Sequence, residues 1–139
     1  MPLSLLICLQ LAVLPWLTDL QQANVAAERE GKVIFLLFTG SDWCPACRRF
    51  DKNVLDTEAF RGYASRNLVL LKADFPRLRR NQLPDSLAAQ NAALAERYNP
   101  EGLFPYIVLL KTGQPAWKGT YQGQTADAFI RRLEQALQP

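Results

Sequence analysis

Two cysteines, Cys44 and Cys47, stand three residues apart where an apolar run gives way to a helical pattern. The run covers residues 33–38 and contains no polar side chain, which is typical of a strand buried on both faces. Pro45 directly follows Cys44, and proline is favoured at the first position of a helix. We therefore expect Cys44 at a helix N-cap and Cys47 one turn later, on the inward face.

This position suits thiol chemistry because cysteine reacts as the thiolate. The unpaired N–H groups and the dipole of a helix stabilise negative charge at its N-terminus, so we expect Cys44 to be an exposed nucleophile with a lowered pKa. Cys44 would attack a target disulfide, and Cys47 would resolve the mixed disulfide. Two other interpretations stay open, a structural disulfide and one half of a metal site shared between two chains.

The length, net charge and composition of the sequence exclude several classes of protein. The 139 residues suit one domain, and the net charge of +3 is too small to indicate a nucleic-acid partner. We expect the basic cluster of Arg77, Arg79 and Arg80 to lie in a solvated loop. The chain has no histidine, which excludes Ser–His and Cys–His hydrolases within it. We expect no metal and no cofactor beyond the cysteine pair itself.

The third cysteine, Cys8, lies in an apolar run over residues 3–17 that has no charged side chain. The length of this run suits the hydrophobic part of a signal peptide better than a membrane span, although no Lys or Arg precedes it. We expect residues 1–15 to be a signal peptide or membrane anchor, with a helix packed on the domain as the alternative. Residues 16–139 would then form one domain, which we expect to be a monomer.

The elements that position the cysteine pair follow from the spacing of apolar residues. Thr18 is expected to cap the first helix and Thr125 the last. The order α-β-α-β-α-β-β-α predicts an α/β fold of three layers, with helices on both faces of a mixed sheet of four to five strands. The expected elements are a helix that includes Leu17 and ends at Gly31, a strand over 33–38, a helix over 45–64 bent near 56–57, a strand over 68–73, a helix over 87–98, a hairpin of strands 106–110 and 116–121, and a helix after 125.

The segment Trp43-Cys44-Pro45-Ala46-Cys47 resembles the active-site motif of the thioredoxin superfamily. Phe104-Pro105 resembles the cis-proline of that family, and residues 119–123 resemble its glycine-containing segment after the last strand. The resemblance runs from about Trp16 to Leu137 and is nearest to exported bacterial thioredoxin-like proteins. It implies a periplasmic or otherwise extracytoplasmic thiol–disulfide oxidoreductase that acts on exported proteins and is recycled by a redox partner protein.

The resemblance also implies roles for single residues. Cys44 matches the nucleophile and Cys47 the resolving cysteine. Pro105 matches the cis-proline beside the reactive cysteine, and the backbone of Phe104 would pair with an extended substrate. Trp43 would cover one side of the disulfide. The alternatives are a trans Pro105, a Trp43 that serves only core packing, and a peptide-binding module whose disulfide is structural.

One departure from the family concerns proton transfer. Thioredoxin has a buried acid in the strand before its motif, with a lysine partner, and this acid helps to deprotonate the resolving cysteine. The matching positions here are Leu37 or Phe38 for the acid and Leu70 for the lysine. We therefore expect the internal proton acceptor to be missing. Asp42 is expected on a surface loop, with a supporting role at most.

Overall fold

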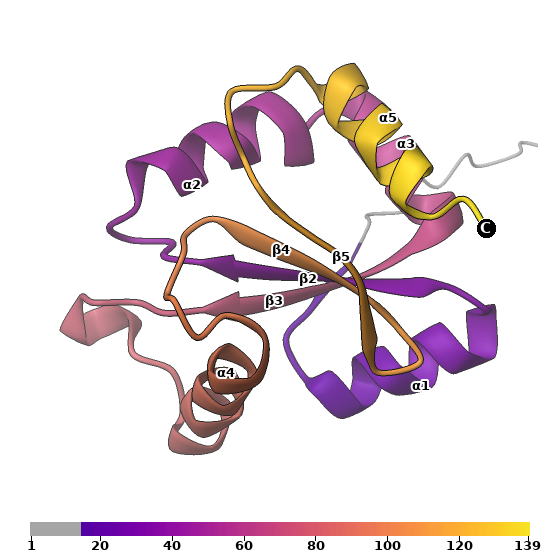
Figure 1. The fold of residues 1–139 in the computed structure, drawn as a ribbon. Helices are drawn as coiled ribbons and strands as arrows, with labels where there is room; N and C mark the ends of the chain where they lie inside the picture. The colour runs from indigo at the N-terminus through magenta and orange to yellow at the C-terminus, as the bar shows by residue number, and fades with distance from the viewer. Residues whose placement is uncertain (1–14) are drawn as a thin grey trace, which may run out of the picture.

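The computed structural model describes residues 15–139 of the chain. Cys8 and all but the last residue of the expected signal or anchor segment lie outside the described residues. The chain folds into three layers, a five-stranded sheet between two layers of helices (Figure 1), as the element order predicts. No helix within residues 15–139 has both the length and the apolar character needed to cross a membrane.

The sheet has the strand order β1-β3-β2-β4-β5. The first three strands in this order run parallel to one another, because helical crossovers join them. The last two are antiparallel and form the expected hairpin. This confirms the mixed sheet. The strands are β1 (Trp16–Leu17), β2 (Val33–Thr39), β3 (Leu68–Asp74), β4 (Tyr106–Lys111) and β5 (Gln114–Thr120).

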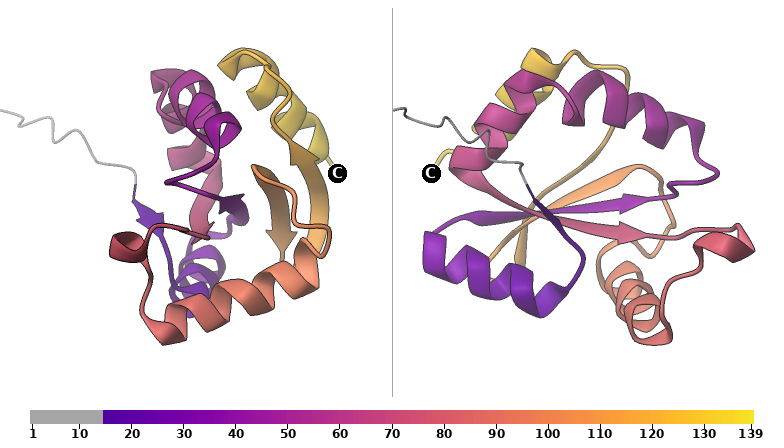
Figure 2. Two further views of the ribbon diagram at one scale, coloured as in Figure 1. Left: turned by 90° about the vertical axis from the view of Figure 1, so that its left-hand side faces the viewer. Right: turned by 180° about the vertical axis from the view of Figure 1, so that it is seen from behind.

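The helices divide between the two faces of the sheet, as Figures 1 and 2 show from three directions. The face that holds the cysteine pair is covered by α2 (Pro45–Phe50), the π-helical turn η1 (Asp51–Leu55), α3 (Glu58–Asn67) and α5 (Ala126–Ala136). The opposite face is covered by α1 (Leu20–Glu30) and α4 (Asp85–Tyr98), and a short 3-10 turn, η2 (Arg79–Asn81), lies in the loop before α4.

The start of α1 differs from the sequence-based expectation. Asp19, and not Thr18, is the N-cap, and its carboxylate accepts a hydrogen bond of 2.9 Å from the Gln22 N–H. The Thr18 carbonyl instead accepts a bond from the Gln90 side chain of α4. Leu17, which we placed on the helix, belongs to β1 and pairs with β3. These long-range bonds end the extended segment one residue later than the local pattern indicates.

The helix after the cysteines is bent where expected, but it is also divided. The N–H of Asp56 bonds to the carbonyl of Asp51, five residues back, so the chain widens into a π-helical turn before it breaks. Thr57 then caps α3 by accepting a bond of 3.2 Å from the Phe60 N–H. The expected single helix over 45–64 is therefore three segments, and the last of them ends at Asn67.

Alternate residues of the buried strands fill two apolar cores, one on each face of the sheet. Phe35 of β2 is fully buried in the core beneath α2, α3 and α5. Its ring makes edge-to-face contacts with Trp16, Phe60 and Phe129, with centroid distances of 6.1, 5.5 and 6.3 Å. Phe35 thus joins the sheet to two helices that support α2.

Replacing Phe35 with alanine should lower the free energy of unfolding by about 3–5 kcal/mol, because it removes a buried ring and leaves a cavity. Urea denaturation followed by circular dichroism measures this loss. Val25→Ala on α1 is the control, since Val25 is 56% exposed. Equal effects of the two substitutions would contradict the packing described for β2.

Candidate active site

Cys44 and Cys47 form a disulfide at the start of α2, directly after β2. Cys44 is the N-cap, with extended backbone angles, and Pro45 occupies the first turn, as expected. The Cys47 N–H donates a hydrogen bond of 3.2 Å to Cys44 Sγ. Because this N–H is one of the unpaired donors of the helix terminus, the same interaction would stabilise a Cys44 thiolate after reduction.

The expectation of an exposed Cys44 is wrong for the oxidised protein. Cys44 is 4% exposed and Cys47 is 1% exposed. The reason is geometric, since the Cys44 sulfur turns back over the first helical turn toward the N–H and sulfur of Cys47. Both cysteines are therefore buried in the oxidised form.

Trp43 is held against the surface beside the disulfide by three neighbours. Its indole N–H donates a bond of 2.7 Å to the Phe75 carbonyl, and its ring meets the Phe104 ring edge-to-face at 5.3 Å. The Arg77 guanidinium lies 3.7 Å from the centre of the Trp43 ring. A side chain at Gly40 would overlap with the indole, so glycine is required there. Trp43 is therefore part of the rim of the site and not only a core residue.

The Phe104–Pro105 peptide bond is cis, as the resemblance implies, and Pro105 is buried. Asn99 positions the loop that leads to it. The Asn99 side chain accepts a bond of 3.0 Å from the Leu103 N–H and donates one of 2.9 Å to the Leu103 carbonyl. β4 starts directly after Pro105, at Tyr106, which lies opposite Phe38 near the end of β2. This register brings Phe104 to Trp43 across sixty residues of sequence.

Asp42 organises the loop after β3. Its carboxylate accepts bonds of 2.9 Å from the N–H groups of Arg77 and Leu78 and one of 3.1 Å from the Asn81 side chain. The bond from the Arg77 N–H is the main reason that the pKa of Asp42 lies below its ordinary value. A carboxyl group with a lowered pKa is a weak proton acceptor, so Asp42 has a structural role here.

Asp74 makes a second connection between the two loops. Its carboxylate accepts bonds from the N–H and hydroxyl of Ser41, at 2.9 and 2.5 Å. The Asp74 carbonyl accepts a bond of 3.1 Å from Asn91, which is buried on α4. Hydrogen bonds therefore join the loops that follow β2 and β3 beside the disulfide, at the same end of the sheet (Figure 1).

The structure decides between the two positions considered for the missing acid. Leu37 lies in the core beneath α2, whereas Phe38 lies in the core on the other face. The position that faces the cysteine helix is therefore Leu37, which is apolar. The residue opposite Leu37 on β3 is Lys72, and not Leu70. The assignment of the lysine position to Leu70 is thus wrong, and a basic residue is present beside Leu37.

Sequence reasoning missed Arg77, Asn99 and Lys72 as parts of the site. The expectation for Arg77 is a solvated loop, and no role is assigned to Asn99 from the sequence. A single signal was available for Lys72, which is the one charged side chain in an otherwise apolar run before Asp74. Its partner on β2 depends on strand register, which the local sequence does not specify.

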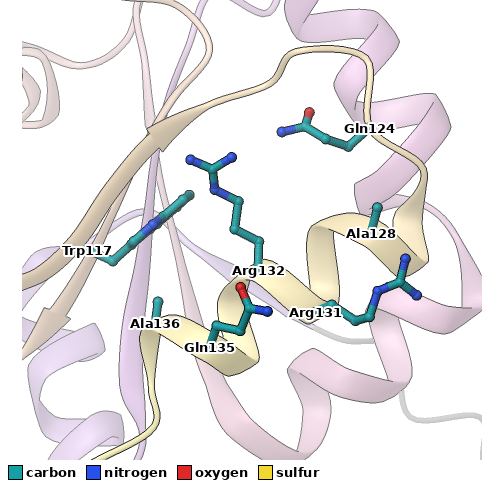
Figure 3. A pocket seen from close by; sticks show the side chains of 7 residues that line it. All are labelled: Trp117, Gln124, Ala128, Arg131, Arg132, Gln135 and Ala136. Carbon is teal, nitrogen blue, oxygen red and sulfur yellow. The ribbon is translucent and has the colours of Figure 1, made fainter.

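One hollow of the surface lies away from the disulfide. It measures about 660 Å³, is lined by Trp117 of β5 and by residues of α5 that include Arg131 and Arg132, and does not include the cysteines (Figure 3). Among residues 15–139, no group of three or more His, Cys, Asp or Glu side chains could hold a metal ion. The disulfide and its aromatic rim are therefore the candidate active site.

Comparison with known proteins shows the family to which the chain belongs. Residues 15–111 match the family described as thioredoxin-like. The chain is similar to disulfide bond reductase DsbH of Chlamydia pneumoniae, with 28% identity over 112 residues that cover 80% of this chain and 66% of that protein. It therefore spans slightly less than two thirds of the length of that relative.

Solved structures show the same fold. A structure described as DsbH oxidoreductase matches with a TM-score of 0.83 and 27% identity, covering 91% of this chain and 85% of the other. A thioredoxin from Thermus thermophilus matches with a TM-score of 0.66 and 20% identity, covering 88% of this chain and 85% of the other. The second likeness shows the shared fold alone.

Replacing Asp42 with asparagine should lower the melting temperature at neutral pH, because the loop N–H groups lose an ionised acceptor. The pKa of Asp42 is lower in the folded protein than in the unfolded chain. Its contribution is therefore fully present above the unfolded pKa and is lost as the pH falls through the folded pKa. Calorimetry from pH 7 into the acid range should show the difference between wild type and Asp42→Asn shrinking. Glu28→Gln, an exposed change on α1, is the control, and a pH-independent difference would contradict this role.

Proposed function

Because the chain belongs to the thioredoxin-like family, we propose that it is a thiol–disulfide oxidoreductase that uses Cys44 and Cys47 on protein substrates. The observation that supports this most strongly is the placement of the disulfide, with Cys44 at the N-cap of α2 and its sulfur accepting the Cys47 N–H. A structural disulfide does not need either the helix terminus or a donor aimed at one of its sulfurs.

In the reducing direction the reaction has two steps. The Cys44 thiolate attacks one sulfur of a substrate disulfide, a Cys44–substrate bond forms, and the substrate S–S bond breaks. Cys47 then attacks the Cys44 sulfur, and the substrate leaves as a dithiol while the Cys44–Cys47 disulfide forms. A redox partner protein must reduce this pair before the next cycle. The name of the relative, disulfide bond reductase, supports the reducing direction for this chain.

The surface beside the disulfide supports a protein or peptide substrate. Leu78 and Leu103 are 41% and 39% exposed, and they are two of the three large apolar side chains exposed within residues 15–139. Each is the neighbour of a residue that contacts Trp43, namely Arg77 and Phe104. We propose that an extended substrate lies along Phe104-Pro105, with its apolar side chains against this rim.

We also propose that the protein works in the periplasm or another extracytoplasmic compartment. The support is the uncharged apolar run of residues 3–17. A monomer remains our prediction, and gel filtration tests it.

Insulin reduction by dithiothreitol tests the activity. Wild-type protein should accelerate the reaction, and Cys44→Ser should reduce the rate to that of dithiothreitol alone, because no nucleophile remains. Cys47→Ser should accumulate a covalent complex with insulin that mass spectrometry detects, because the mixed disulfide is not resolved. If Cys44→Ser matched wild type, the chain would instead be a peptide-binding module with a structural disulfide.

The apolar rim can be tested separately. Leu103→Ser should raise KM for insulin about fivefold with little change in kcat, since a partly covered leucine contributes on the order of 1 kcal/mol to binding. Val25→Ser is the control, because Val25 is also an exposed apolar side chain, at 56% against 39% for Leu103, but lies on α1, away from the rim. An equal rise in KM for both variants would contradict a docking surface at Leu103.

A further inference from the structure

The resolving step needs a base that the mechanism above does not yet contain. Cys47 attacks the mixed disulfide as a thiolate, and it is 1% exposed, so bulk water has little access to its proton. Leu37, the strand residue that faces α2, is apolar and cannot accept this proton. The inference that follows rests on the proposed function, because it concerns the second step of that reaction.

One carboxylate lies on the same helical face as Cys47. Asp51 follows Cys47 by four residues, and its N–H donates to the Cys47 carbonyl, so the helix is continuous between them. Side chains four residues apart on a helix lie one above the other, with about 5–6 Å between Cβ atoms. A single water molecule can bridge the gap between the carboxylate and the sulfur. Asp51 is half-buried, whereas Cys47 is buried, so the carboxylate is in contact with solvent and the thiol is not.

The sheet carries a cation on the face that α2 covers. Lys72 of β3 pairs with Leu37 of β2 and follows Leu68 and Leu70 in the strand alternation, so its side chain lies on the α2 face of the sheet. Lys72 is half-buried, and its ammonium nitrogen lies 4.9 Å from the centre of the Trp16 ring. Lys72 thus lies on the face of the sheet beneath α2, beside Leu37, the position that matches the buried acid of thioredoxin.

The charges around Asp51 act in opposite directions. Burial raises the pKa of Asp51 most strongly, the Lys72 charge lowers it, and the Asp56 and Asp74 charges raise it. The other elements packed on η1 are α3 and α5, and they meet its Val54 and Leu55 through apolar side chains that include Phe60 and Phe129. The result is a carboxyl group with a raised pKa, which accepts a proton more readily than an ordinary surface aspartate does.

We propose that Asp51 is the proton acceptor for Cys47 in the resolving step, and that Lys72 keeps Asp51 ionised until the proton arrives. The Cys47 S–H bond breaks, its proton passes to an Asp51 oxygen, and the Cys47 sulfur bonds to Cys44 Sγ. The Cys44–substrate bond breaks, the substrate sulfur leaves as a thiolate, and the Asp51 proton then returns to solvent or to that thiolate. Two electrons pass from the cysteine pair to the substrate sulfurs, and no further reactant is needed.

Stopped-flow reaction of the reduced protein with Ellman's reagent separates the two steps. The protein carries Cys8→Ser in all variants, because the Cys8 thiol would also react with the reagent. In this background the first thionitrobenzoate released reports attack by Cys44, and the second reports resolution by Cys47. Asp51→Asn should leave the first phase unchanged and slow the second about 100-fold at neutral pH, within the range of general-base contributions. The second phase of Asp51→Asn should recover toward wild type at alkaline pH, where hydroxide removes the proton.

Two further variants make the result specific. Lys72→Met should move the pH profile of the second phase to higher pH, because Asp51 without its cation ionises less readily. Glu58→Gln, an exposed change in the first turn of α3, is the matched control and should leave both phases unchanged. Absence of the first phase in wild-type protein would overturn the proposed function itself. Equal second phases in wild type and Asp51→Asn, or equal slowing of both phases, would overturn the role of Asp51 alone.

Thermal stability gives an independent readout. An acid whose pKa is raised by folding costs stability in its ionised form, so the cost is present when the pH is above its folded pKa. Asp51→Asn removes this cost and should melt at a higher temperature than wild type at neutral pH, while it resolves the mixed disulfide more slowly. A variant that is both slower and less stable would indicate a structural role and would contradict the proposal.

Discussion

The hydrogen bond from the Cys47 N–H to Cys44 Sγ is the interaction on which the rest of the site depends. This bond requires a helix that starts at Cys44. A short turn, in which the N–H groups of Trp43 and Cys44 donate to the Gly40 carbonyl, connects the buried end of β2 to that helix. Gly40 also leaves room for Trp43 to lie against the backbone. One local structure therefore contains the end of β2, Trp43 and the cysteine pair. The turn at Gly40 positions both Trp43 and the start of α2.

Two loops from distant parts of the chain keep this local structure in place. Asp42 and Asp74 bind the loops after β2 and β3 to each other. Asn99 holds the loop before the cis Phe104–Pro105 peptide, so that Phe104 meets Trp43. The contacts use backbone N–H groups and charged or amide side chains near the surface, whereas the apolar cores fix the sheet below. The site thus has a packed apolar base, and polar hydrogen bonds connect the loops at its rim.

The sequence was sufficient for the parts of the structure that local chemistry decides. The apolar run of β2, the Cys44 N-cap, Pro45 and the Thr125 cap of α5 all follow from neighbouring residues. The errors concern register and long-range bonds. The strand β1, the shift of the first cap to Asp19 and the pairing of Lys72 with Leu37 depend on contacts with β3 or α4, which no local pattern contains. The burial of Cys44 depends on the oxidised geometry and could not be read from spacing alone.

The central claim is that the Cys44–Cys47 pair is a redox centre and not a structural crosslink. Its reduction potential, measured at equilibrium in glutathione or dithiothreitol buffers, tests this most directly. Catalytic pairs of this fold have potentials of about −270 to −120 mV, whereas structural disulfides in secreted proteins are typically below about −300 mV. We predict one two-electron transition within the catalytic range. A potential below about −300 mV would contradict the account, because the pair would then remain oxidised throughout any physiological cycle.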